Sequence, residues 1–287
     1  VSKRPTAEPV RELQVQFGDN ARRQIAGDFA GQLDAEGKLL YRITGVLRDA
    51  QLPAAKEADD HGYIAPSLTW KPSADTSLTL LSMFTRTRGG VYTRARPTIG
   101  SLEPTAIGTY IPSKLFTGEP GFDQFNQDQR MIGYQFEHRI DGTFTVRQNA
   151  RYAAQKLDYR GVQASGFVSL NPDDANDIAN FTQLSRSVFG SRENIGAVAL
   201  DNQLQADFRT GDVTHKLLVG LDYQRTRIDQ VTFSGGSAPP LNIYAPVHGG
   251  AYDIPAPYFD GITRLNQTGL YPVSYTHLRA HETRGNL

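Results

Sequence analysis

Few of the side chains that could carry chemistry stand at a spacing that catalysis or metal binding requires. His277 and His281 lie four residues apart, a spacing that could clamp a metal ion on a helix, but we expect it to be accidental. Asp173, Asp174 and Asp177 could bind calcium on a loop, although a solvated acidic loop is the simpler interpretation. The sequence contains no cysteine and no motif typical of serine hydrolases, zinc peptidases or nucleotide-binding loops. We therefore predict no enzyme activity, no metal site and no cofactor.

Aromatic side chains offer binding chemistry instead. The chain has 13 Tyr, 14 Phe and one Trp, and many of these rings fall in long segments between predicted strands. Such rings present a rigid apolar surface and, in Tyr and Trp, a polar tip, which suits the binding of a small ligand. The candidates are Tyr92, Tyr110, Phe116, Phe122, Phe125, Tyr159, Phe167, Tyr244, Tyr252, Tyr258 and Phe259. The alternative for each ring is that it holds its own loop together.

The composition excludes several classes of protein. The 287 residues carry 30 Lys and Arg against 30 Asp and Glu, so a general nucleic-acid binder is not expected. Mean hydropathy is −0.44, and no segment approaches the ~18 consecutive apolar residues of a membrane-spanning helix. A membrane β-barrel is not excluded, because its strands hide their apolar half in alternation with polar residues.

Alternation of apolar and polar residues recurs about ten times along the chain. The predicted strands cover residues 12–17, 24–33, 39–47, 63–71, 77–85, 130–138, 144–152, 198–208, 216–225 and a last one beginning at 267–271. Most are about eight to eleven residues long. Membrane-crossing strands need roughly 9–11 residues, whereas strands of globular proteins average only ~5–6.

The links between these strands alternate in length. Short links at 34–37, 72–76, 140–143 and 209–213 alternate with long ones at about 49–62, 86–128, 157–196 and 226–266. Short turns on one rim and long loops on the other are typical of a membrane barrel. The pattern therefore predicts an all-β fold, a partial antiparallel up-and-down transmembrane β-barrel.

Aromatic residues near the strand ends support this prediction. They would form girdles at the two membrane interfaces. One girdle would hold Tyr41, Trp70, Phe144 and Phe208, and the other Phe17, Tyr63, Phe84 and Tyr223. Polar residues on the second face of the strands indicate a wet interior, because burying them unpaired would cost several kcal/mol each. The alternative is a soluble β-sandwich whose edge aromatics pack under loops.

Short motifs that occur in order along the chain carry a resemblance to a known family. They are VSKRPT at 1–6 with PVRE at 9–12, IAP at 64–66 with TWKP at 69–72, IGY at 132–134 with Phe136 and His138, TFTVRQN at 143–149, TGD at 210–212, LNIY at 241–244 with Pro246 and Val247, and QTG at 267–269. Together they resemble TonB-dependent siderophore receptors of the ferrichrome-receptor type. In such a receptor the first motif would be the junction between plug and barrel.

The resemblance implies a 22-stranded outer-membrane barrel filled by an N-terminal plug, of which this chain would hold a part. We expect residues 1–10 to be the end of the plug and its junction. Residues 11–271 would form the partial barrel, with short periplasmic turns and long extracellular loops, and residues 272–287 would be a non-native tail. Ten strands cannot close at the radius of a 22-stranded barrel, so we predict an open sheet with two unpaired edges.

The resemblance also implies a function. Receptors of this family take up ferric siderophores, and the iron(III) chelate is their ligand and not a cofactor. The implied partners are the siderophore, the TonB–ExbB–ExbD complex acting through the plug, and outer-membrane lipid with lipopolysaccharide. The full-length protein would be a monomer in the outer membrane of a Gram-negative bacterium. The alternatives are a passive outer-membrane porin and a soluble β-sheet binding module.

The predicted siderophore contacts lie in the long loops. They are Tyr92, Arg94, Phe167, Tyr244 and Tyr252. Other aromatic positions that line the ferrichrome cup of this family correspond to non-aromatic residues here. These are Thr93, Ala95, Gln163 and Ser165. The departures favour a hydroxamate siderophore other than ferrichrome.

A group of arginines flanks Tyr92. Arg86, Arg88, Arg94 and Arg96 could draw an anionic ligand inward. A solvated loop and contacts with lipopolysaccharide phosphates are the alternatives for these four side chains.

Overall fold

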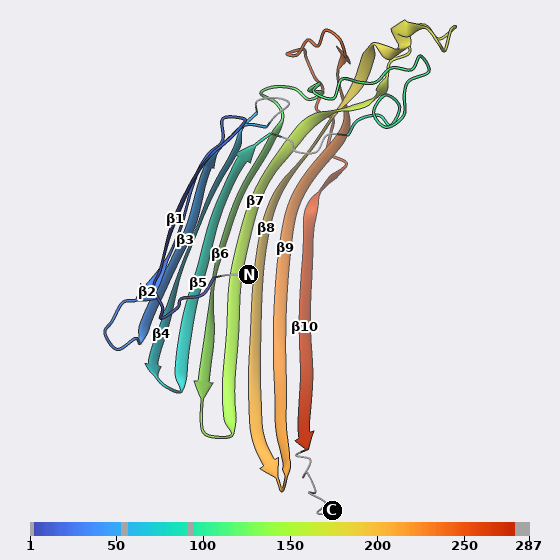
Figure 1. Cartoon of the computed structure of the whole chain (residues 1–287). Helices are drawn as coiled ribbons and strands as arrows, with labels where there is room; N and C mark the ends of the chain where they lie inside the picture. Colours follow the sequence, from blue (N-terminus) through green and yellow to red (C-terminus); the bar gives the residue numbers. More distant parts are fainter. Residues whose placement is uncertain (1–2, 53–56, 91–94, 279–287) are drawn as a thin grey trace, which may run out of the picture.

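The computed structural model describes residues 3–52, 57–90 and 95–278. Its strands are β1 (Val10–Phe17), β2 (Arg23–Gln32), β3 (Leu39–Asp49), β4 (Asp59–Ser73), β5 (Thr76–Gly89), β6 (Gln124–Arg139), β7 (Phe144–Phe167), β8 (Gln183–Thr210), β9 (Val213–Asn242) and β10 (Phe259–Leu278). They form one antiparallel sheet in which each strand pairs with its neighbours in sequence (Figure 1). A 3-10 helix, η1 (Ile178–Phe181), lies between β7 and β8. None of the helices in the described ranges is long and apolar enough to cross a membrane.

The order of the strands confirms the predicted up-and-down fold class. Tight turns after β2, β4, β6 and β8 lie at one rim, and the long links after β3, β5, β7 and β9 lie at the other (Figure 1). In the described part of the chain β1 and β10 each pair with a single strand, so the sheet is open, as predicted.

One face of the sheet, here called the inner face, carries the N-terminal residues 3–9 across β2 and β3. The Lys3 Nζ atom lies 2.7 Å from the Asp28 carboxylate, which Arg42 also binds at 2.7 Å. Arg42 Nη1 donates a hydrogen bond of 3.1 Å to the backbone carbonyl of Arg4. These contacts hold the N-terminal segment against the polar side of the sheet.

The opposite face, here called the outer face, is apolar and uncovered. Alternation places Ile25, Ile64, Leu80, Ile132 and Val198 on it, and these side chains are 44–56% exposed. Exposure of apolar surface to water costs roughly 25 cal/mol per Å². A whole face of this kind is therefore suited to contact with lipid.

The predicted girdle residues lie on the outer face with one exception. Those on the outer face are Tyr41, Trp70, Phe144 and Phe208 near the short-turn rim, Phe17 and Phe84 nearer the other, and Tyr223. Tyr223 lies in the half of β9 that adjoins the short turn, so its predicted place in the girdle at the long-link rim is wrong. Tyr63 is the exception, because it pairs with Val46 and points to the inner face, where its Oη atom lies 3.4 Å from Thr44 Oγ1. The prediction that Tyr63 belongs to a girdle is therefore wrong.

The turn between β6 and β7 lies at the short link predicted for residues 140–143. The Asp141 carboxylate accepts hydrogen bonds from the backbone amides of Phe144 (2.7 Å) and Thr143 (2.8 Å). These two donors favour the charged form and lower the pKa of Asp141 below its ordinary value. The Asx-type contact ends one strand and begins the next at this rim.

Strands β7, β8 and β9 are much longer than predicted. They contain 24, 28 and 30 residues, against 8, 10 and 11 in β1, β2 and β3. Their upper parts rise beyond the other strands toward the long links (Figure 1). Side chains there are surrounded by loops and water, so no apolar face is required. Bulges also shift the register between Ala164 and Gly166 and between Val188 and Phe189. Both effects remove the regular alternation of polarity, so the sequence pattern does not reveal these extensions.

The last strand also differs from its prediction. β10 begins at Phe259 and continues through Pro272, which pairs with Val219, to Leu278. The expectation that the strand pattern ends at Pro272 is therefore wrong. Proline is tolerated here because β10 is an edge strand, on which one side needs no ladder hydrogen bond. The non-native origin of residues 272–287 stays a prediction, and 279–287 lie outside the described residues.

Two buried apolar clusters lie where the long links meet the extended strands. The first consists of Ile111, Leu115, Ala164, Leu184, Leu241 and Ile243. The second consists of Phe122, Val162, Val188, Phe233 and Ala238. Each cluster joins the link between β5 and β6 to the upper parts of β7, β8 and β9. The long-link rim is thus a packed structure with its own small cores.

A charge on the outer face should prevent insertion of the intact parent protein. We expect Ile132→Lys to reduce the folded, membrane-inserted fraction strongly, because a lysine at the bilayer midplane costs about 2–4 kcal/mol. Charged residues at Leu80, Leu200 and Val219 should act alike. The control is Gln135→Lys, which places the same charge on the inner face of the same strand. Normal heat-modifiable migration of the Ile132 variant in isolated outer membranes would contradict the assignment of the two faces.

Candidate functional site

Three half-buried rings form a row on the inner face near the long-link rim, here called the aromatic row. They are Phe125 of β6, Tyr159 of β7 and Phe189 of β8. The ring centroids of Phe125 and Tyr159 are 5.7 Å apart, and those of Tyr159 and Phe189 are 5.4 Å apart, both edge to face. The register brings them together, because Phe125 pairs with Tyr159, and Gly161 pairs with Phe189. The row gives a ligand a continuous aromatic surface across three strands.

Amides and hydroxyls line the inner face below the aromatic row. Gln129 donates to the side chain of Gln155 at 2.7 Å. Ser191 Oγ and Gln230 Nε2 donate to Glu193 Oε1 at 2.8 and 3.0 Å. Rings above convergent polar groups are typical of small-molecule sites.

The structure places three of the five predicted siderophore contacts. Tyr92 and Arg94 lie outside the described residues. Phe167 packs edge to face on Phe181, with centroids 5.7 Å apart, and against the first apolar cluster. That is the packing expected of a ring that holds its own loop together.

Tyr244 and Tyr252 lie in the link between β9 and β10. Tyr244 is 58% exposed, and Tyr252 is 41% exposed although its ring lies 4.4 Å from that of Phe122. Among the described residues, no ring contact joins either tyrosine to the aromatic row. Their accessible surfaces leave both as candidates, and their contact with a ligand stays a prediction.

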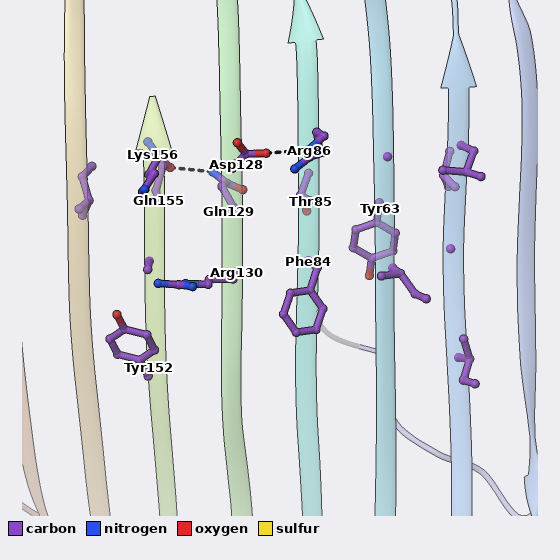
Figure 2. A pocket seen from close by; sticks show the side chains of 18 of the residues that line it. Tyr63, Phe84, Thr85, Arg86, Asp128, Gln129, Arg130, Tyr152, Gln155 and Lys156 are labelled. Carbon is purple, nitrogen blue, oxygen red and sulfur yellow. Dashed lines mark hydrogen bonds and ion pairs between the residues drawn. The ribbon is translucent and has the colours of Figure 1, made fainter. Parts of the chain in front are cut away.

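Of the arginines that flank Tyr92 in the sequence, Arg86 and Arg88 of β5 do not act as predicted. Arg86 and Arg88 lie on the outer face, where they bind the Asp128 carboxylate at 3.0 and 2.7 Å (Figure 2). Arg96 donates hydrogen bonds to loop carbonyls, among them that of Pro112 at 3.4 Å. The prediction that Arg86 and Arg88 draw an anionic ligand inward is therefore wrong, because alternation turns them away from the inner face.

A broad depression of about 1270 Å³ lies on the outer face, where the apolar surface meets charged groups (Figure 2). Gly27, Gly45 and Gly62 form part of its floor, and apolar side chains such as Ile64 and Phe84 surround them. Charged residues form its upper edge, here called the charged belt. The belt consists of Arg86, Asp128, Arg130, Lys156, Arg227 and Asp229. Within the described residues, neither Arg130 nor Lys156 has a carboxylate within ion-pair distance.

A buried ion pair, here called the clasp, joins four segments at the long-link rim. Arg186 Nη1 of β8 lies 3.0 Å from the carboxylate of Glu119, and their side chains are 0% and 2% exposed. Arg186 also donates to the backbone carbonyls of Gly118 (3.0 Å) and Pro239 (2.7 Å), and the Gly249 amide donates to Glu119. A buried pair needs such additional hydrogen bonds to offset the cost of desolvation. The clasp therefore fixes the link between β5 and β6 against β8, β9 and the link after β9.

Sequence reasoning missed Phe189, Glu193 and the clasp. Phe189 and Glu193 lie in the segment 157–196, which was predicted as a long link because its alternating positions are mostly polar or small. Glu119 and Arg186 are 67 residues apart in sequence, and neither stands in a motif. The register of the extended strands places Phe189 and Glu193, and the packing of the link against β8 places Glu119 beside Arg186.

Fold and site together define a class of protein: the wall of a membrane β-barrel with an aromatic surface at its long-link rim. The sequence matches the family described as TonB dependent receptor-like, beta-barrel over residues 68–275. The chain belongs to this family.

Relatives and solved structures agree with this membership. The chain is 35% identical over 260 residues to the ferrichrome outer membrane transporter/phage receptor of Escherichia coli K12, covering 86% of this chain and 34% of the relative. It is 34% identical over 272 residues to the ferrioxamine B receptor of Salmonella typhimurium SL1344, covering 94% and 37%. The chain thus spans little more than a third of these relatives. The fold resembles the ferric-catecholate import receptor Fiu of E. coli K12 (TM-score 0.76, 17% identity, 96% and 39% covered) and the pyoverdine receptor FpvA of Pseudomonas aeruginosa (0.78, 15%, 95% and 39%).

Breaking the clasp should release the loops at this rim. We expect Arg186→Ala to leave the Glu119 charge buried without its partner, which costs about 3–5 kcal/mol. Limited proteolysis of the full-length protein should then cleave within residues 95–123 much faster than in the wild type. The double variant Glu119→Leu with Arg186→Met removes both charges and should recover most of the protection. Equal protection of wild type and Arg186→Ala would show that the apolar clusters alone hold the loops.

Proposed function

We propose that this chain is part of an outer-membrane receptor that takes up ferric siderophores of the hydroxamate type with energy supplied through TonB. The observation that carries the proposal is the aromatic row above a wall of amides and hydroxyls, on a sheet whose outer face is apolar. Long loops of outer-membrane barrels face the outside of the cell. The aromatic row would therefore meet a ligand that arrives from the medium.

The chemistry of the ligand fits this surface. Iron in a ferric siderophore is already fully chelated, so its receptor needs stacking surfaces and hydrogen bonds in place of metal ligands. No group of three or more His, Asp or Glu side chains in the described ranges is placed to hold a metal ion. The names of the ferrichrome and ferrioxamine receptors among the relatives support a hydroxamate ligand.

The N-terminal segment supports a plugged barrel over an open porin. Residues 3–9 lie on the inner face and are held there by Asp28 and Arg42. This is where the end of a plug would reach the barrel wall, which agrees with residues 1–10 as the plug junction. In the full-length monomer the TonB–ExbB–ExbD complex of the inner membrane would act on that plug. A passive porin would show neither saturable ligand binding nor uptake that depends on the proton-motive force.

The charged belt supports lipopolysaccharide as a lipid partner of the outer face. Arg130 pairs with the exposed Phe84 of β5, and Lys156 stands above the exposed Tyr152 on the same strand (Figure 2). Cations at this height would meet the phosphates of the outer leaflet, and the glycine-floored depression below would receive acyl chains. A surface cation contributes about 1 kcal/mol to the binding of an anionic lipid surface.

Reversal of a belt charge should weaken lipopolysaccharide binding. We expect Lys156→Glu in the full-length receptor to lower its affinity for lipopolysaccharide by roughly fivefold or more per charge removed. Titration of the purified receptor with lipopolysaccharide measures the change. The control is Lys216→Glu, which alters a cation near the short-turn rim that pairs with Asp207 at 3.6 Å. Equal affinities of the wild type and the Lys156 variant would exclude the belt as the phosphate site.

Loss of a ring from the aromatic row should weaken siderophore binding. We expect Tyr159→Ala to reduce the affinity of the full-length receptor for a ferric trihydroxamate by roughly tenfold, because an edge-to-face ring contact contributes about 0.5–1.5 kcal/mol beyond its buried area. Equilibrium binding to purified receptor measures it. The control is Tyr152→Ala, which removes the same side chain from the outer face of the same strand. Equal affinities of the Tyr159 and Tyr152 variants for the chelate would show that the ligand does not contact the aromatic row.

A further inference from the structure

The carboxylate of Glu193 stands in the inner wall just below the aromatic row. Glu193 belongs to β8 and pairs with Leu157 of β7 and Gln230 of β9. Ser191 and Gln230 both donate to its Oε1 atom. In the described part of the chain, Oε2 accepts no hydrogen bond, and no cation lies within ion-pair distance of Glu193. The side chain is half-buried, so its position is constrained while one oxygen stays open to a ligand.

Among the described residues, the wall around Glu193 offers it no partner charge. Its neighbours on the inner face are uncharged: Gln155, Leu157, Tyr159, Ser191, Ile195, Ile228, Gln230 and Thr232. Arg48 of β3 lies five strands away from β8 and is paired with Asp59 at 2.7 Å.

The cations at the height of Glu193 are turned the other way. Lys156 adjoins Leu157, the partner of Glu193, and Arg192 precedes Glu193 in β8; alternation puts both side chains on the outer face. This part of the inner wall therefore carries a net negative charge. Among the described residues, an anionic ligand would find no compensating cation at this place, whereas a cationic group would find an open carboxylate oxygen below three aromatic rings.

We propose that Glu193 receives a positively charged group of the siderophore and so selects cationic ferric hydroxamates over neutral and anionic chelates. This inference rests on the proposed function. Three hydroxamates neutralise iron(III), so a pendant primary ammonium gives such a chelate one net positive charge. The ammonium would donate a charge-assisted hydrogen bond to Glu193 Oε2, and the faces of Tyr159 and Phe189 would add cation–π attraction. A trianionic chelate would be repelled by the same carboxylate.

A matched pair of ligands isolates the charge. Ferrioxamine B carries a free ammonium beside its ferric trihydroxamate core, and its N-acetyl derivative is the same chelate without that charge. We expect the purified full-length receptor to bind the ammonium form about five- to tenfold more tightly, as for a partly solvated ion pair. Glu193→Gln should remove this preference by weakening binding of the ammonium form alone.

The control variant is Glu137→Gln. It removes the same charge from the inner face at the short-turn rim, where Glu137 pairs with Arg147 at 2.5 Å, and it should keep the preference for the ammonium form. Equal weakening of both chelates by Glu193→Gln would assign Glu193 to folding or to a plug contact and overturn the inference. An unchanged preference in that variant would overturn it as well. If the wild type binds neither chelate, the proposed hydroxamate function itself is wrong. If it binds both chelates equally, the proposed function stands and only the role of Glu193 is excluded.

Discussion

A single layer of sheet that separates two different surroundings is the constraint on which this structure depends. Because successive side chains of a strand point to opposite faces, a slip of one residue would move Ile132 inward and bring the neighbouring polar residues to the apolar side. The same alternation turns Asp28 and Arg42 toward the N-terminal segment. Register, strand order and the two kinds of surface therefore follow from one pattern of polarity, without a central apolar core.

Where β7, β8 and β9 extend beyond the apolar outer face, the alternation of polarity no longer determines the structure. Packing between the strands and the long links replaces it. The extended parts of β7, β8 and β9 meet water and loops, so their stability must come from packing that the strands and links make among themselves. The clasp between Glu119 and Arg186 is the polar counterpart of these clusters. Its hydrogen bonds to Gly118, Pro239 and Gly249 bring four segments of the chain to one place.

The part of the sheet with an apolar outer face could be predicted from the sequence, and the extended rim that carries the aromatic row could not. Alternation around Ile132 and Val198 revealed their strands, whereas Phe189 lies among serines and glycines whose polarity resembles that of a loop. Alternation also shows which residues share a face, and it contains the information that Arg86 points outward; the error came from treating residues after Phe84 as a loop. Contacts such as Glu119 with Arg186 depend on three-dimensional packing and leave no local signal.

Side chains of opposite charge at the same height of the sheet are kept apart because they lie on opposite faces. Arg192 and Glu193 are consecutive residues, yet the first faces outward beside the charged belt and the second faces the mouth. Consecutive residues of opposite charge would offset each other in a loop. In a strand the intervening sheet keeps them apart, so one short segment presents a cation on the outer face and a carboxylate on the inner face. The two positions are coupled through register, because whatever holds Arg192 outward also holds Glu193 inward.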